Sequence, residues 1–283
     1  MRLRHVVLAG FALISMPRPV AGQATLPQPH SRVTLLAANT GLGMVTAVLG
    51  QVVRGARIDP RKAAQGAVGG AMVFSGKAIV AKDRWYANLF GRQIAAIGGS
   101  GIQNVASGNK FLDRASLPYG PLRFNIERES GTRLRVKLDL ARTGVLVMAL
   151  SDVHMEMEVS KSLLYGVAVF RDSSPNGDKG AAGSHVGGVV TYREVAIDGL
   201  TMQQSLERTM AHELIHVLQA DFSFNTWGRP LERTFMKENE TTRKLYSYFD
   251  LGLDVPLASL ANSFISYSSR PWEREAVSLP ARR

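Results

Sequence analysis

The chain of 283 residues contains no cysteine, and this absence excludes several classes of protein at once. It can have no disulfide framework, no cysteine-linked lipid near its N-terminus and no thiolate that binds a metal. Any zinc site must therefore be built from histidine, aspartate and glutamate. Aromatic residues make up only 7% of the chain, and the lysines and arginines are scattered rather than interleaved with them. No nucleic-acid partner is therefore expected, despite a net charge of +11.

The N-terminus has the three parts of a secretory signal. A basic start is followed by an apolar run over 6–16 and then by small residues. We expect a signal peptide over 1–24, cleavage near Gly22 or Ala24, and export to the periplasm or the extracellular space. The alternative is an uncleaved membrane anchor, although so short an apolar run spans a bilayer poorly. Cleavage would remove three arginines and no acid, which leaves a charge of about +8 and favours an anionic membrane or envelope surface as a partner.

Three segments rich in glycine and alanine follow and define the first expected domain, 25–117. The first segment, 33–53, contains no charged residue, and the others cover 63–75 and 87–106. We interpret them as helices that approach one another closely along small side chains. Soluble or peripheral packing is favoured because charged residues such as Lys77 interrupt the later segments. The alternative is a hairpin that enters the membrane, where packing through small residues is common.

From residue 122 onward the hydrophobic pattern changes from helical to alternating. Residues 134–140 alternate apolar and charged side chains, which predicts a strand with one buried face. Further strands are expected at 122–126, 145–150, 155–159, 163–170 and 188–197, with a glycine-rich loop at 172–184. Short turns such as Ser130-Gly131 predict a mainly antiparallel sheet of about five or six strands.

After the strands the helical period returns. Thr201 is expected to cap a helix over 202–221, and further helices are expected over 237–248 and from Pro271. The predicted fold class is therefore α+β: small-residue-rich N-terminal helices, a mainly antiparallel sheet and a C-terminal helical part. The sheet and the C-terminal helices form the second expected domain, 118–283.

The sequence His212-Glu213-Leu214-Ile215-His216 carries the strongest chemical signal in the chain. Histidines four residues apart lie on one side of a helix, so both can bind the same ion. The apolar stripe of this helix consists of Leu206, Met210, Leu214, Val217 and Leu218. We expect that stripe to face the core and the histidines to line an open cleft. The pattern predicts a zinc ion bound by His212 and His216, with Glu213 as general base.

A catalytic zinc ion needs a third protein ligand and one position for water. The longer motif with a third histidine is excluded because Phe222 occupies that position. A downstream carboxylate is the natural choice, and Glu273 and Glu275, on the helix that begins at Pro271, are the candidates. Three other acids are closer in sequence but are expected to be solvated: Glu232, Glu238 and Glu240.

HELIHVLQ (212–219), together with the later Glu-x-Glu-Ala sequence, resembles the gluzincin-type metallopeptidases. These include prenyl-protease and HtpX-like peptidases and the HELxHxxQ domains of bacterial exported proteins. The resemblance covers roughly 184–280 and implies a zincin-like C-terminal part, with Glu273 as the third metal ligand. In those families an aspartate four residues further on supports the site, and here Val277 stands at that position. The resemblance assigns nothing to the first 120 residues.

These features together predict a zinc metallopeptidase that hydrolyses a peptide or protein substrate. Glu213 would take a proton from a metal-activated water and pass it to the leaving amine. Tyr192, His185 and Tyr267 are candidate donors to the oxyanion, although a structural role is the first expectation for each. The strand at 188–197 is expected to bind an extended peptide by edge pairing. The rival interpretations are a non-catalytic envelope or membrane-associated protein with a vestigial or structural metal site, and an integral membrane peptidase.

Overall fold

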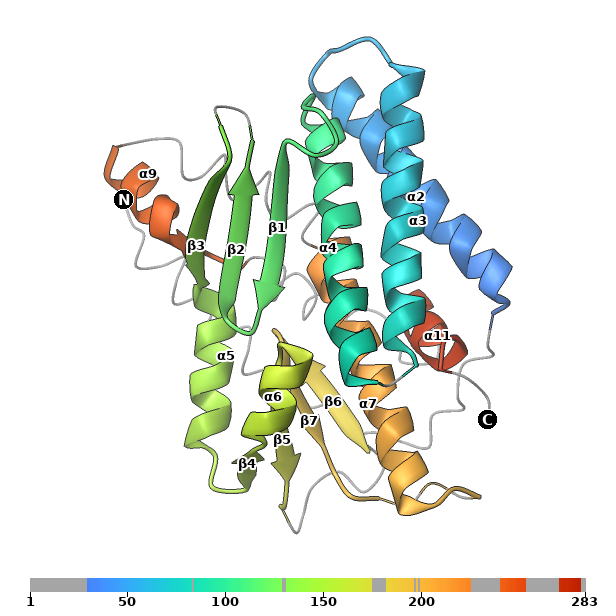
Figure 1. Ribbon diagram of the computed structural model, residues 1–283, viewed down its shortest axis with the longest axis vertical. Helices are drawn as coiled ribbons and strands as arrows, with labels where there is room; N and C mark the ends of the chain where they lie inside the picture. The colour runs from blue at the N-terminus through green and yellow to red at the C-terminus, as the bar shows by residue number, and fades with distance from the viewer. Residues whose placement is uncertain are drawn as a thin grey trace.

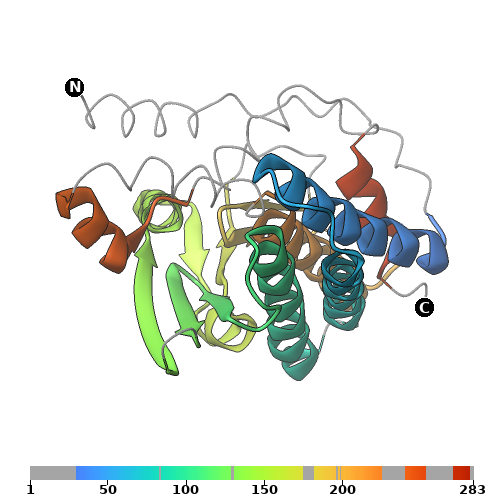
Figure 2. The same cartoon turned by 90° about the horizontal axis from the view of Figure 1, so that it is seen from above.

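The computed structural model describes residues 30–82, 84–128, 131–174, 182–195, 197, 199–224, 240–252 and 270–280. It is an α+β protein in which a group of N-terminal helices lies beside two four-stranded sheets (Figure 1). Seen from above, the helical group occupies one side of the molecule and the sheets the other (Figure 2). The expected signal peptide, 1–24, lies outside the described residues.

The three small-residue segments are helices α2 (Arg32–Val53), α3 (Pro60–Val80) and α4 (Trp85–Ala106), as predicted. Their backbones pack too closely for larger side chains. A Cβ atom on Gly43 would lie 2.2 Å from the carbonyl oxygen of Gly66. Because only glycine lacks that atom, the glycines set the spacing between α2 and α3.

The side of α2 that faces away from α3 is apolar and exposed. Its exposed side chains include Leu42, Val45, Leu49 and Val52. Within the described residues α2 is the one helix long and apolar enough to cross a membrane, judged by length and composition alone. Its other side is buried against the neighbouring helices through Gly43 and Ala47.

The first sheet contains β1 (Arg114–Tyr119), β2 (Leu122–Glu127), β3 (Arg133–Asp139) and β8 (Phe249–Asp250), in that order. The first three strands are antiparallel, whereas β8 pairs parallel to β3. The two strands predicted here are present as β2 and β3, and β1 and β8 are additional. Strand β1 spans the expected domain boundary at 117/118 and packs on α4, so the helical region and the sheet are continuous in space.

The second sheet has the order β4-β5-β7-β6, formed by β4 (Met155–Met157), β5 (Ala168–Asp172), β6 (Gly183–Val186) and β7 (Val189–Tyr192). Strands β5 and β7 are parallel and the other pairs antiparallel. Two mixed sheets therefore replace the single, mainly antiparallel sheet predicted from sequence. Short turns reveal hairpins, but the parallel pairs β5–β7 and β3–β8 join segments whose connections carry no such local signal.

One segment predicted as a strand is a helix, and a second is helical at its start and joins β5 only from Ala168 onward. Helix α5 (Leu140–Ser151) contains the segment 145–150, and α6 (Val159–Tyr165) contains the beginning of 163–170. The carboxylate of Asp139 accepts a hydrogen bond from the first turn of α5 and so caps it. The solvent side of α5 is also apolar, so the sequence shows no polar face and resembles a buried strand.

Helix α7 (Met202–Gln219) carries the two histidines and continues as a π-helix, η1 (Ala220–Phe224). Thr201 caps α7 as predicted, because its side chain accepts a hydrogen bond from the first turn. The helices predicted after α7 correspond to α9 (Glu240–Tyr248) and α11 (Pro271–Ser278), and the predicted residues 237–239 lie outside the described part.

The apolar stripe of α7 is buried in the main core, as predicted. Met210, Leu214 and Leu218 pack in one cluster with Val73 of α3 and Val190 of β7. Because this cluster joins the helical group to the second sheet, α7 is held on both sides by large elements. The position of its histidines is therefore set by the core and not by a surface loop.

Candidate metal centre

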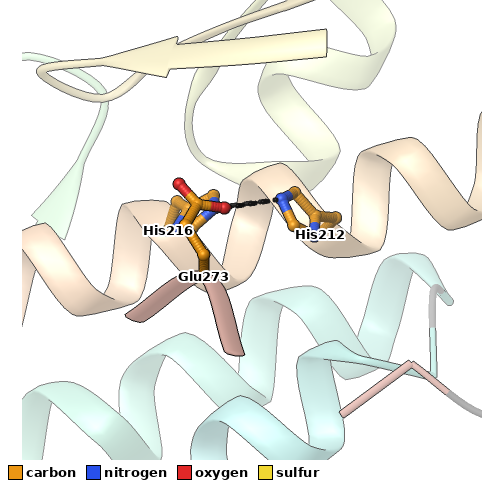
Figure 3. Close-up of side chains that lie close together, drawn as sticks. All are labelled: His212, His216 and Glu273. Atoms are coloured by element: carbon orange, nitrogen blue, oxygen red, sulfur yellow. Dashed lines mark hydrogen bonds and ion pairs between the residues drawn. The ribbon is translucent and has the colours of Figure 1, made fainter. Parts of the chain in front are cut away.

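Three potential metal ligands converge from two helices that are far apart in sequence. His212 and His216 lie one turn apart on α7, and Glu273 reaches them from the first turn of α11 (Figure 3). The Nε2 atoms of the two histidines are 3.0 Å apart. Oε2 of Glu273 lies 3.0 Å from Nε2 of His216 and 3.4 Å from Nε2 of His212. These atoms could serve as three ligands to one ion.

The spacing of these three atoms fits a small tetrahedral ion. Ligands that each lie about 2.0–2.1 Å from a tetrahedral zinc ion are separated from one another by about 3.3 Å. The three separations observed here span 3.0 to 3.4 Å. Two imidazole nitrogens and one carboxylate oxygen are also a donor set that zinc accepts, with a fourth position left for water.

The histidine side of α7 is more enclosed than the expected open cleft. His216 and Glu273 are buried, and only His212 is partly exposed. The enclosure has a clear origin, since α11 packs along one side of α7 and β6 lies against another. Among the three potential ligands, solvent therefore reaches chiefly His212.

Glu273 is held as a carboxylate by the histidines around it. Burial alone would raise the pKa of Glu273, but hydrogen bonds and charge interactions with His212 and His216 outweigh burial and hold that pKa well below its usual range. The negative charge is thus stabilised where a cation would bind.

Glu213 lies beside the cluster with a different electrostatic environment. Burial raises the pKa of Glu213 to about 7, the charge of Glu273 adds to this effect, and His212 opposes it. A Cβ atom on Gly183 of β6 would lie 3.0 Å from Cγ of Glu213, so the strand covers this side chain. A carboxyl group with a pKa near neutrality can both accept and return a proton at physiological pH.

Of the three candidate oxyanion donors, the structure brings His185 to the site. The ring of His185 stacks on that of His216, with centroids 5.2 Å apart, and its Nδ1 lies 3.8 Å from a carboxylate oxygen of Glu213. Burial lowers the pKa of His185 to about 3, with the neighbouring His216 as the second cause, so its imidazole is neutral. Tyr192 instead donates its hydroxyl hydrogen to Glu158. Tyr267 lies outside the described residues.

Glu275, the alternative third ligand, turns away from the histidines. Its carboxylate accepts hydrogen bonds from Lys77, Asn39 and Gln219, each 2.8 Å long. Burial alone would raise the pKa of Glu275, but Lys77 and the hydrogen bonds lower it. The other acids considered do not join the cluster either: Glu240 is exposed on α9, and Glu232 and Glu238 lie outside the described residues.

The edge strand beside the site is β6, not the strand predicted over 188–197. Strand β7 is paired with β5 on one side and with β6 on the other, so it has no free edge. Gly187 and Gly188, both with positive φ, form the tight turn that adds β6 outside β7. A Gly-Gly pair is a recognised hairpin signal, and it marks this turn in the sequence.

No protein-family model, curated protein or solved structure matches this chain. The site must therefore be interpreted from its own geometry and chemistry.

Proposed function

We propose that the protein is an exported zinc metallopeptidase with a zincin-like catalytic part. The observation that carries this proposal is the convergence of two imidazole nitrogens and one carboxylate oxygen at separations of 3.0 to 3.4 Å, with Glu213 beside them. Two residues of the HELIH sequence and one of the later Glu-x-Glu-Ala sequence meet there. The resemblance to gluzincin-type peptidases supports the same assignment.

In the proposed reaction each side chain has a defined task. His212, His216 and Glu273 hold the zinc ion, which when bound supplies a Lewis acid for water and for the scissile carbonyl. Glu213 takes the proton of the attacking water and passes it to the leaving nitrogen. Its raised pKa suits both transfers. The neutral imidazole of His185 is available as a hydrogen-bond donor to the developing oxyanion.

The free edge of β6 provides a binding surface for an extended peptide. Within the described residues no strand pairs with its outer side, and β6 lies against α7 close to Glu213. A peptide that pairs with this edge would pass near the proposed metal ligands. The proposed substrate is therefore an extended peptide or an unfolded protein segment.

Paired glutamate variants test the function. Glu213→Gln should keep one zinc ion per chain, because it removes no proposed ligand. It should lower the hydrolysis of casein by about 10²–10⁴-fold, because it removes the proposed base. Glu273→Gln should lose zinc affinity first and activity with it. Glu240→Gln, on the exposed helix α9, is the control and should change neither quantity. Full zinc content and activity in Glu273→Gln would refute the assignment, and zinc binding by the parent chain without hydrolysis would favour the non-catalytic alternative.

The exposed side of α2 supports the proposed association with an anionic membrane or envelope surface. Its apolar side chains are flanked by three exposed arginines, Arg32, Arg54 and Arg57. Such an arrangement favours apolar contact together with attraction to anionic headgroups. Sedimentation with anionic vesicles should exceed that with neutral vesicles, and Leu42→Ser/Val45→Ser should weaken it. N-terminal sequencing of the secreted product tests export.

A further inference from the structure

A chain of buried polar side chains connects the N-terminal helices to the second histidine of α7. It runs from Lys77 on α3 through Glu275 on α11 to Gln219 and His216 on α7, with Asn39 of α2 at its side. The side chain of Lys77 is only 2% exposed, so its charge is removed from water and is compensated by Glu275. A buried lysine is costly unless it is paired, and this one contacts the site indirectly.

The first hydrogen bonds of this series of polar side chains have a fixed donor and acceptor. Lys77 can only donate, and its Nζ lies 2.8 Å from Oε2 of Glu275 and 3.0 Å from Oδ1 of Asn39. Asn39 therefore offers its oxygen to Lys77 and its nitrogen to the other oxygen of Glu275, at 2.8 Å. The carboxylate of Glu275 is thus a pure acceptor toward both Lys77 and Asn39.

The same reasoning fixes the amide of Gln219. Its Nε2 lies 2.8 Å from Oε2 of Glu275 and 2.9 Å from the carbonyl oxygen of Trp272, and both partners are acceptors. A reversed amide would bring its oxygen against two other oxygens. The amide oxygen must therefore face His216, whose Nδ1 lies 2.7 Å away.

The direction of this last bond determines where His216 carries its hydrogen. Because the amide oxygen can only accept, Nδ1 of His216 must donate and so carries a hydrogen. The Nε2 atom faces His212 and the carboxylate of Glu273, which accepts a hydrogen bond from it in the metal-free protein. With Nδ1 occupied by its hydrogen, Nε2 is the ring atom that can give up a hydrogen and bind a metal.

We propose that Gln219 is a positioning residue that holds a hydrogen on Nδ1 of His216 and so turns Nε2 toward His212 and Glu273, and that Lys77 and Glu275 fix the orientation of the Gln219 amide. The consequence for metal affinity rests on the proposed function, whereas the position of the hydrogen does not. Val277, which stands at the place of the supporting aspartate in the resembling families, has no hydrogen-bonding side chain. Lys77 also gives the N-terminal helices a role in the site, which the resemblance does not assign to them.

Nuclear magnetic resonance of the metal-free protein tests the tautomer directly. The chain contains six histidines, so ¹⁵N-histidine labelling with a His216→Gln reference spectrum identifies the signal. At a pH of about 8 the parent should show hydrogen on Nδ1 of His216, the atom that donates to Gln219. Gln219→Met should lower the fraction of His216 rings with hydrogen on Nδ1, and Lys77→Met should lower it in the same direction.

Zinc titration gives the second readout. Gln219→Met should weaken zinc binding by about 10–100-fold, the usual effect of losing a partner that orients a ligand. Gln203→Met, an exposed substitution on the same helix, is the matched control and should change neither the tautomer nor the affinity. If Gln219→Met does not fold, Gln219→Asn shortens the side chain, keeps its polarity and should show the same two effects.

The possible outcomes separate this inference from the proposed function. Absence of hydrogen from Nδ1 of His216 in the parent protein, or an unchanged Nδ1 hydrogen in both Gln219 variants, would overturn the positioning role. If the parent binds no zinc but has the hydrogen on Nδ1, which the Gln219 variants lose, the positioning role stands and the proposed metallopeptidase function fails.

Discussion

Replacing Glu213 with glutamine should stabilise the metal-free protein at neutral and alkaline pH, although the same change removes the proposed catalytic base. The reason is electrostatic. Glu213 is buried beneath β6 and close to the carboxylate of Glu273, so its ionised form is unfavourable in the folded state. Glutamine has almost the same size but cannot ionise. The variant therefore avoids the cost of a buried charge.

The magnitude follows from the pKa of Glu213, which burial raises from 4.5 to about 7. Below about pH 4.5 both the folded and the unfolded states are protonated, and the group has no net effect. Between about pH 4.5 and 7 the unfolded chain releases the proton while the folded protein keeps it, so stability falls as pH rises. At about 1.4 kcal/mol per pKa unit, the full loss is about 3 kcal/mol, of which about 2.5 kcal/mol lies between pH 5 and pH 8.

Urea unfolding in the presence of a chelator measures this difference. The parent and Glu213→Gln should be compared at several pH values from about 5 to 8, because titrating groups that do not interact with Glu213 are shared and cancel in the difference. The advantage of the variant should grow by roughly 2–3 kcal/mol across this range. A difference in unfolding free energy that does not change with pH would show that Glu213 is not desolvated, and the electrostatic reasoning would be wrong.

Four further substitutions test the helix packing, a buried ion pair and a helix cap by thermal and urea unfolding. Gly43→Ala places a Cβ atom 2.2 Å from a carbonyl oxygen of α3 and should cost about 1–3 kcal/mol or more, whereas Gly41→Ala, with open space around it, should stabilise α2 by up to about 1 kcal/mol. Equal effects of the two would refute the close approach of these helices. Asp221→Asn removes the carboxylate paired with two buried arginines and should cost about 3–5 kcal/mol, and a neutral result would mean that the pairs are solvated. Thr201→Ala should cost about 1 kcal/mol through the lost cap of α7, and no change would show that the cap is not formed in solution.

The parts of the structure that were predictable from sequence are those with local signals. Thr201 precedes α7 and caps it, the stripe that includes Leu214 and Leu218 repeats with the helical period, and His212 and His216 share a face by spacing alone. Each of these features depends on residues within a few positions of one another. A single sequence therefore contains the information needed to place them.

The errors occurred where exposed apolar residues or long connections removed that local signal. In α5 the side chains of Val147, Met148 and Leu150 are exposed, so the pattern predicted a strand buried on both faces. Asp139, the cap of α5, was the signal that favoured a helix. No local sequence pattern indicates the parallel pairing of β5 with β7, because this pairing depends on the arrangement of the whole sheet.

The same distinction between local and long-range signals applies to the candidate site. The HELIH spacing predicted two of the clustered residues, and only the resemblance selected Glu273 over Glu275. The contact of Lys77 with Glu275 spans 198 positions, and no pattern within either helix indicates it. The sequence offered one indication of this contact: Lys77 is a charged residue in a segment whose small residues are otherwise suited to close helix packing.

The sequence separation of the clustered residues also has a consequence for folding kinetics. His216 and Glu273 are 57 positions apart, and the link between α3 and α11 closes a much longer loop of chain. Closing such loops costs conformational entropy before the favourable contact energy can offset that loss. These long-range contacts are therefore expected to form after the local helices. The ligand geometry would then be complete only when α7, α11 and the N-terminal helices have all docked. A zinc ion that binds only this docked arrangement would slow the opening of α11, and hydrogen exchange in that helix should report the presence of metal more strongly than exchange in the outer helices.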